Sequence, residues 1–385
     1  MRTTLLLYIL IFFTVACQQQ GENKEVIQNK KDSATTITVG VFNKNGDSPY
    51  CITDALEAVK IDGDIEARVI SAAEIMSGAT DDIDVYLFPG GSGRSETGSL
   101  GEQGQQKIIN LVKTQGKGVV GICAGAYILS ETPGYPSLDL SAGEAIDIEH
   151  DHRGHGLVKF SLTDAGKKIF PELQGREINF SQYYEGPVLI PAKNSVYKYN
   201  ELATMESDVH LVEGTPANMT NNRPFIIITD VEKGRTASVV GHPECTPGMR
   251  WMIPRLVRVV AKKEIKRYGE NVVRPEIYTK EILYTKEQLS KQRSAYNKLI
   301  GSKEDKLQGM CDIVDMCAWS AKKWIPPMLR DKDVEVRLLA AKLTVQLERT
   351  DAIADLKAAI DSEQDLESKK QFQAYLKALK EMTGK

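Results

Sequence analysis

The chain has 385 residues, of which 26% are charged, and its 49 basic and 52 acidic side chains leave a formal net charge of -3. That length is enough for two or three domains with full hydrophobic cores, so the fold requires no disulfide or metal to hold it together. Because there is no basic excess, nucleic acid is not expected as a partner.

The N-terminus has the pattern of an export signal. Residues 5–13 are an apolar run, which is shorter than the roughly 20 residues of a membrane-spanning helix. The letters VAC at 15–17 resemble the end of a bacterial lipobox, although Thr14 stands where leucine is usual. We expect a lipoprotein-type signal peptide over residues 1–17 with lipidation at Cys17, and a plain signal peptide is the alternative.

Residues 18–36 are polar and almost free of aromatic side chains, so they are predicted to form a flexible linker. An acylated Cys17 would then tether the protein to a membrane. The expected location is therefore the cell envelope, facing the periplasm or the outside.

From Ile37 onward, short apolar runs alternate with longer amphipathic stretches. ITVGVF, IEARVI, VYLF and GVVGI are predicted strands, and the stretches between them are predicted helices. This alternation predicts an α/β fold with an open, doubly wound and mostly parallel sheet. Ligands bind such sheets outside the carboxyl ends of the strands. Two of those ends carry distinctive residues, Pro89-Gly90-Gly91 and Cys123.

The pattern becomes irregular between residues 144 and 200, with shorter strands and many turns. PFIIITD and RTASVVG then predict two strands joined as a hairpin around Glu232-Lys233-Gly234. The second strand runs into His242-Pro243-Glu244, and Met249 to Tyr268 is predicted to be a basic amphipathic helix. These segments would complete a domain over residues 37–262.

Residues 263–385 show no strand pattern and have apolar residues at helical spacing, which predicts a separate all-helical C-terminal region. Ile325 to Leu347 resembles one unit of a HEAT-type repeat, but a stable solenoid requires about three. We expect these helices to pack on the sheet domain or on a partner protein.

Cys123 lies at the centre of Gly121-Ile122-Cys123-Ala124-Gly125, which has the spacing of a nucleophile elbow. Such a turn is tight, so Cβ atoms on either side of the nucleophile would not fit. The position at the start of the next helix is expected to lower the pKa of the thiol and favour the thiolate. Without the flanking glycines, a lone cysteine in an apolar stretch would be read as core packing.

A thiol that performs acyl transfer also requires a proton shuttle and a group that orients it. His242 follows a predicted strand, and Glu244 can reach its imidazole around the turn. In this order the motifs resemble the class I glutamine amidotransferase superfamily, over about Ile37 to Lys262.

That resemblance implies a flavodoxin-like fold and a triad with Cys123 as nucleophile, His242 as base and Glu244 as orienting carboxylate. It also identifies Pro89-Gly90-Gly91 with the oxyanion loop of the family. The amides of Gly91 and Ala124 would hold the oxyanion.

The stretch GICAGAY, together with YYEGP at Tyr183 to Pro187, looks like the biotin-protein ligase N-terminal domain, a member of that superfamily whose activity is poorly defined. This resemblance offers Tyr183, Tyr184 and Glu185 as pocket walls, although the tyrosines could equally be packing residues. Tyr127 stands where glutaminases of the class usually have glutamine, which argues against free glutamine as the substrate. No biotinyl-adenylate loop occurs, so the protein is not expected to be a biotin ligase.

No metal or cofactor is predicted. His150 and His152 could share one face of a strand as metal ligands, or the segment around Arg153 could be a polar hairpin tip. Cys51 and Cys245 could form a regulatory disulfide or be ordinary packing residues.

The sequence thus predicts an exported, lipid-anchored thiol hydrolase or amidase that acts on a small amide or related carbonyl. A first alternative is a non-catalytic binding module that keeps the pocket and uses the C-terminal helices to bind a protein partner. A second is a redox or aldehyde-handling thiol protein of the DJ-1-like kind, but the activating glutamate of those proteins has no match in GVFNKNGDSPYC.

Overall fold

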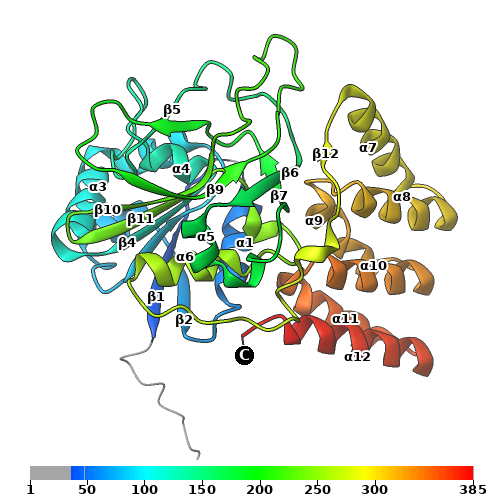
Figure 1. Ribbon diagram of the computed structural model, residues 1–385. Coiled ribbons are helices and arrows are strands. Elements are labelled where there is room, and N and C mark those ends of the chain that lie inside the picture. Colours follow the sequence, from blue (N-terminus) through cyan, green and yellow to red (C-terminus); the bar gives the residue numbers. More distant parts are fainter. Residues whose placement is uncertain (1–35, 47, 385) are drawn as a thin grey trace, which may run out of the picture. The chain divides into compact units, whose positions relative to one another are not determined.

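The computed structural model describes residues 36–46 and 48–384 (Figure 1). The predicted signal peptide, the lipidation site at Cys17 and nearly all of the predicted linker lie outside the described residues. Among the helices of the described part, none combines the length and the apolar composition that a membrane span requires.

A ten-stranded sheet organises the described chain, in the order β12-β6-β9-β10-β11-β4-β3-β1-β2, with β7 paired to β6 off this path. Five strands at one end are mutually parallel. They are β2 (Ile65–Ile70), β1 (Ile37–Phe42), β3 (Val85–Phe88), β4 (Gly118–Ile122) and β11 (Gly234–Val239). Their order along the sheet is the 2-1-3-4-5 order of flavodoxin-like folds. The predicted α/β class with a doubly wound sheet is confirmed.

Helices cover both faces of this parallel part, which explains why its strands are apolar throughout. Leu87 of β3 packs in one buried cluster with residues of the helices α1 and α6, and its neighbour Phe88 packs in a second cluster with residues of α3 and α4. The helices on the two faces are α1 (Pro49–Val59), α2 (Ala72–Ser77), α3 (Gly93–Gln115), α4 (Ala124–Leu129) and α6 (Met252–Val260).

The rest of the sheet is antiparallel and begins with the predicted hairpin, which is confirmed as β10 and β11. Residues 144–200 contribute strands to it, although their sequence pattern is irregular. The remaining elements of this region are β5 (Gly143–Ala145), β6 (His155–Leu162), α5 (Asp164–Ile169), β7 (Asn179–Tyr184), β8 (Leu189–Pro191), β9 (Tyr199–Met205) and β10 (Pro224–Val231). β5 and β8 pair with each other as a small separate sheet.

The helix predicted over Met249–Tyr268 is shorter, because the α6 run ends near Lys262, whose φ is 55°. Its apolar and polar residues are segregated as predicted, but all of its residues are buried, the polar ones included. Its two arginines are compensated inside the fold, since Arg255 pairs with Glu172 and Arg258 with Asp62.

The C-terminal region is mainly helical only from Lys286 onward, and before that it contains a two-residue strand, β12 (Ile282–Leu283), so the prediction that it contains no strand is wrong. β12 pairs with β6, where Gly156 leaves room for the carbonyl of Ile282. Two residues are too few for a sequence pattern to detect. The helices are α7 (Lys286–Lys298), α8 (Lys303–Asp315), α9 (Ala321–Trp324), α10 (Val334–Gln346), α11 (Ile353–Ser362) and α12 (Leu366–Glu381).

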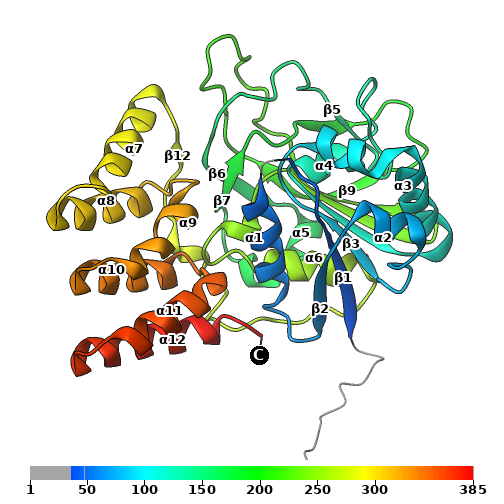
Figure 2. The same ribbon diagram turned by 180° about the vertical axis from the view of Figure 1, so that it is seen from behind.

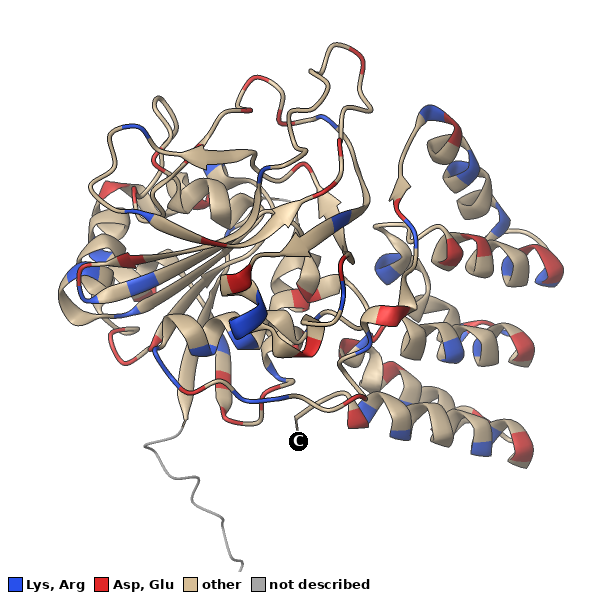
Figure 3. Cartoon of the chain, in the orientation of Figure 1, with Lys and Arg blue, Asp and Glu red and all other residues tan. Residues whose placement is uncertain are grey.

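These helices lie beside the β6 and β7 side of the sheet in both views (Figures 1 and 2). From Thr36 onward the chain forms a single compact unit, and Leu356 of α11 belongs to the same buried cluster as Ala55 of α1. Along the outer surfaces of the helices, acidic and basic residues alternate (Figure 3).

Buried ion pairs attach the C-terminal region to the sheet domain. Asp54 of α1 is fully buried, accepts a hydrogen bond from Lys322 Nζ at 2.6 Å, and also pairs with Arg349. Glu348 accepts a hydrogen bond from the Gly248 amide at 2.8 Å, and its carboxylate lies 4.0 Å from the guanidinium of Arg250 in the sheet domain. A buried charge is costly unless it is paired, so these contacts depend on one another.

We expect the Asp54→Ala variant to lose roughly 3–5 kcal/mol of unfolding free energy, because it leaves the buried Lys322 without a carboxylate and leaves Arg349 with Asp351 alone. Urea denaturation would measure the loss. The matched control is Asp355→Ala, which removes the partner of the exposed Arg330 and should cost less than about 1 kcal/mol. Equal losses in the two variants would contradict this account.

The same carboxylate predicts a pH dependence. Burial by itself would raise the pKa of Asp54, but the charges of Lys322 and Arg349 outweigh it and hold the pKa below its ordinary value. A depressed carboxyl pKa contributes stability that is present above about pH 4 and is lost as the pH falls further. The stability difference between the parent protein and Asp54→Ala should therefore shrink in acid denaturation measurements below that pH.

Candidate active site

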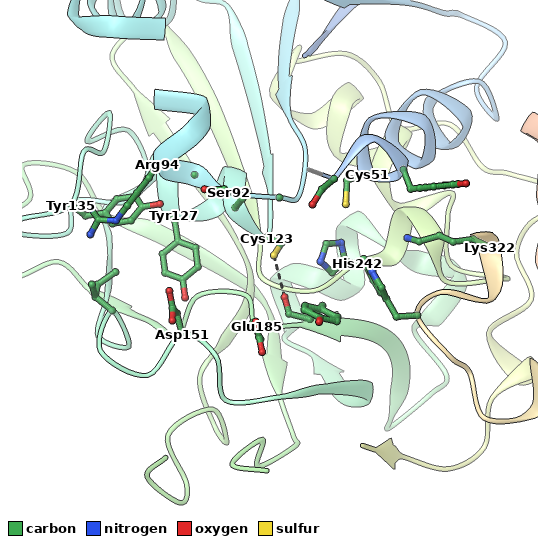
Figure 4. Close-up of a pocket in the computed structure, with 18 of the residues that line it drawn as sticks. Cys51, Ser92, Arg94, Cys123, Tyr127, Tyr135, Asp151, Glu185, His242 and Lys322 are labelled. Atoms are coloured by element: carbon green, nitrogen blue, oxygen red, sulfur yellow. Dashed lines mark hydrogen bonds between the residues drawn. The ribbon is translucent and has the colours of Figure 1, made fainter. Parts of the chain in front are cut away.

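A pocket of about 540 Å³ opens at the carboxyl ends of β1, β3 and β4 (Figure 4). This is the switch point of the strand order, where doubly wound folds bind ligands. The lining comes from five parts of the chain: Ser48, Tyr50 and Cys51; Gly91, Ser92, Gly93 and Arg94; Cys123, Ala124, Tyr127, Tyr135, Ile148 and Asp151; Tyr184, Glu185 and His242; and Trp319, Lys322 and Lys323.

Cys123 occupies the turn between β4 and α4 with φ 50° and ψ -103°, a conformation that a residue with a side chain rarely adopts. A Cβ on Gly121 would lie 2.3 Å from the carbonyl oxygen of Gly125, and a Cβ on Gly125 would lie 2.2 Å from that of Phe88. Neither distance is compatible with a side chain. The steric argument for glycine on both sides of Cys123 therefore holds in the structure.

His242 and Glu244 are joined by a hydrogen bond of 2.6 Å between Nδ1 and Oε1. Both side chains are buried, with exposed fractions of 2% and 1%. The amide of His242 donates to the carbonyl of Gln182 at 2.7 Å, and the Thr246 hydroxyl donates to the carbonyl of His242 at 2.7 Å. With Nδ1 engaged by the carboxylate, Nε2 is the imidazole nitrogen left for chemistry in the pocket.

Cys123 and His242 line the same pocket, but no hydrogen bond joins them among the contacts of the described residues. The thiol instead donates to the carbonyl of Tyr184 at 3.4 Å. Burial, followed by the Glu244 carboxylate, raises the pKa of Cys123 to about 12. The amide of Ala124 at the start of α4 does lower this pKa, but burial of the sulfur outweighs it, so the expected net lowering is wrong.

The loop after β3 packs directly against the imidazole. A Cβ on Gly90 would lie 2.6 Å from His242 Cε1 and 3.3 Å from Cys51 Sγ. Asn45 holds this loop by donating from Nδ2 to the carbonyl of Gly90 at 2.7 Å. Gly91, the other glycine of the predicted oxyanion loop, lines the pocket, as does Ala124. Sequence reasoning missed Asn45, although it stands just after the first strand in GVFNKNG.

The predicted pocket tyrosines divide into two groups. Tyr184 lines the pocket with Glu185, whose pKa is raised by burial and then by Asp151. Tyr183 is fully buried and donates from its hydroxyl to the carbonyl of Gly186 at 2.7 Å, so it supports the pocket from below. Tyr127 lines the pocket, and its hydroxyl donates to Asp147 at 2.5 Å.

Arg153 is not at an exposed hairpin tip, which was one of the two alternatives for this segment. Its guanidinium is buried, pairs with Asp147 and donates to the Tyr183 hydroxyl at 2.5 Å. His150 and His152 belong to the turn before β6, so they do not share the face of a strand.

One other group among the described residues could hold a metal ion, since ligand atoms of His242, Glu244 and Cys245 lie within 4.8 Å of one another. An ion there would compete with the His242–Glu244 hydrogen bond. Among the described cysteines, which include Cys51 and Cys245, all are free thiols.

A buried carboxyl that the sequence did not single out lies on the first turn of α3. Both carboxylate oxygens of Glu96 are buried without a hydrogen-bond partner among the described residues. Burial, followed by the nearby Cys123, raises the pKa of Glu96 well above its ordinary value. Burial therefore favours the neutral, protonated form of Glu96.

Comparison with models of known protein families finds no match, and comparison with curated proteins finds none either. Among solved structures, a ThuA-like protein from Parabacteroides merdae is 13% identical, with a TM-score of 0.43 over 61% of this chain and 92% of that one. The glutaminase domain of Trypanosoma brucei CTPS with bound acivicin is 12% identical, with a TM-score of 0.42 over 61% and 97%. These similarities are remote, and the fold assignment above rests on the strand order of the sheet itself.

The raised pKa of Cys123 predicts how its reaction with an alkylating reagent depends on pH. The rate at which iodoacetamide modifies Cys123 should rise about tenfold per pH unit between pH 7 and pH 9.5, because only the thiolate reacts. Peptide mass spectrometry would resolve Cys123 from the other thiols, and the half-buried Cys311 provides an internal reference. A plateau in the Cys123 rate below pH 8 would contradict the protonated resting thiol.

Proposed function

We propose that the protein is a thiol-dependent hydrolase or amidase with an amidotransferase-like site, acting on a small amide or related carbonyl compound. The observation that carries this proposal is the buried 2.6 Å contact between His242 and Glu244 in the pocket that contains Cys123. A nucleophile on a strained turn, a histidine and its orienting carboxylate are the parts that acyl transfer requires.

Because the resting thiol is protonated, its deprotonation would be coupled to attack. His242 Nε2 would take the thiol proton as Sγ bonds to the carbonyl carbon, while Glu244 stabilises the imidazolium. The oxyanion would be held by the amides of Gly91 and Ala124. The imidazolium would then protonate the leaving amine, and water would release the acyl group from Cys123 with His242 as base.

A second candidate is a binding module without turnover, and the buried thiol that hydrogen bonds to Tyr184 favours it. Such a protein would keep the pocket and bind its ligand without forming a bond to Cys123. The two candidates differ in whether an acyl group appears on the sulfur.

Exposure of the purified protein to cell extract should therefore produce an acyl adduct on Cys123 that mass spectrometry detects. Cys123→Ala should carry no adduct, and His242→Ala should form it at least about a hundredfold more slowly, since the general base is lost. Cys311→Ala, which changes a thiol on α8 outside the pocket, is the control and should behave like the parent protein. Ligand retention without any adduct would instead favour the binding module.

We also propose that the protein is exported and tethered to a membrane through Cys17. The lipobox-like letters before that residue support this. Expressed in bacteria supplied with radiolabelled palmitate, the full chain should incorporate label, and Cys17→Ala should not. Equal labelling of the two proteins would reject the anchor.

A further inference from the structure

The C-terminal region contributes a side chain directly to the wall of the pocket. The ring of Trp319, just before α9, meets the imidazole of His242 edge-on, with centroids 4.5 Å apart and planes at 64°. It also contacts the ring of Tyr184 at 5.3 Å. Trp319 therefore covers the proposed catalytic base with a side chain from outside the sheet domain.

Lys322 holds this tryptophan in place. Its Nζ lies 3.7 Å from the centroid of the Trp319 ring and donates to Asp54 Oδ2 at 2.6 Å. Burial by itself would lower the pKa of Lys322, but Asp54 outweighs it and raises the pKa above its ordinary value. The ammonium thus stays charged, with its charge already balanced by a carboxylate.

Lys323 is different, because it is exposed and makes no ion pair among the described residues. Its Nζ lies 5.3 Å from the ring of Tyr50, which also lines the pocket. Figure 4 shows Lys322 beyond His242 at one end of the pocket, Arg94 and Tyr135 at the opposite end, and Asp151 and Glu185 between them. The end next to Trp319 therefore carries one cation that no protein carboxylate neutralises.

From these contacts we propose that the segment Trp319 to Lys323 forms a subsite that binds a carboxylate of the ligand, with Lys323 as its counter-ion and Trp319 as its wall. At this end of the pocket a singly charged group fits better than a phosphate dianion, because Lys322 is balanced by Asp54 and Lys323 is then the one remaining cation of the segment. The other cation of the lining, Arg94, lies over the ring of Tyr135. This inference rests on the proposed function in taking the occupant to be the substrate of Cys123. The substrate class is then a small amide that carries a carboxylate.

Tryptophan fluorescence tests the subsite without knowledge of the substrate. The chain has three tryptophans; Trp251 is fully buried, and Trp324 is 43% exposed. In a Trp324→Phe background, Trp319 is therefore the tryptophan that solutes reach. We expect Lys323→Gln to lower the quenching constant for iodide at least twofold, while quenching by neutral acrylamide stays unchanged. Acetate at constant ionic strength should protect Trp319 from iodide, and this protection should be lost in Lys323→Gln.

The matched control is Lys332→Gln, which makes the same charge change at an exposed position of the C-terminal region outside the pocket lining. It should leave both quenching constants unchanged, and Lys323→Arg should restore the iodide effect. Equal iodide quenching in the two glutamine variants, or no protection by acetate, would overturn the carboxylate subsite. Repeating the measurement in Cys123→Ala separates the two proposals, because the iodide effect should persist there, whereas the acyl adduct depends on Cys123.

Discussion

The pocket includes residues of the C-terminal region because the buried carboxylate of Asp54 attaches that region to α1. This carboxylate joins α1 to two cations of the C-terminal region, Lys322 and Arg349, which follow it by 268 and 295 positions. A buried charge costs free energy when it has no partner. Separation of the helical region from α1 would therefore leave these charged groups buried without partners or would expose them to solvent. The ring of Trp319 lies against His242 because Lys322, fixed by Asp54, lies on its other side.

Burial also determines how readily the Cys123 thiol loses its proton. The buried sulfur of Cys123 loses the solvation that a thiolate requires, and the neighbouring Glu244 carboxylate adds to the penalty. In the proposed reaction the thiol proton would therefore pass to His242 as the sulfur–carbon bond forms. In this respect the proposed mechanism is closer to that of a serine hydrolase than to that of an enzyme with a preformed thiolate.

Features encoded by short, local patterns could be predicted from the sequence. The glycines around Cys123 reflect contacts with residues nearby in the fold, and His242-Pro243-Glu244 places base and carboxylate on one turn. Asn45, Arg153 and Trp319 could not be predicted in this way, because each has a partner far along the chain. Asn45 binds Gly90 at a separation of 45 positions, Arg153 binds Gly186 at 33, and Trp319 contacts His242 at 77. The direction of the thiol pKa was wrong for a related reason. Burial depends on the assembled fold, whereas the helix that follows Cys123 can be predicted from the residues next to it in the sequence.

Because Trp319 covers His242, it also limits the access of bulk water to the imidazole. The short helix α9 carries Lys322, so opening of this segment would have to separate the buried ion pair of Lys322 with Asp54. Such an opening would hydrate the imidazole and weaken the electrostatic interactions around it. The access of water to His242 is thus limited by an ion pair that is far from the nucleophile in sequence.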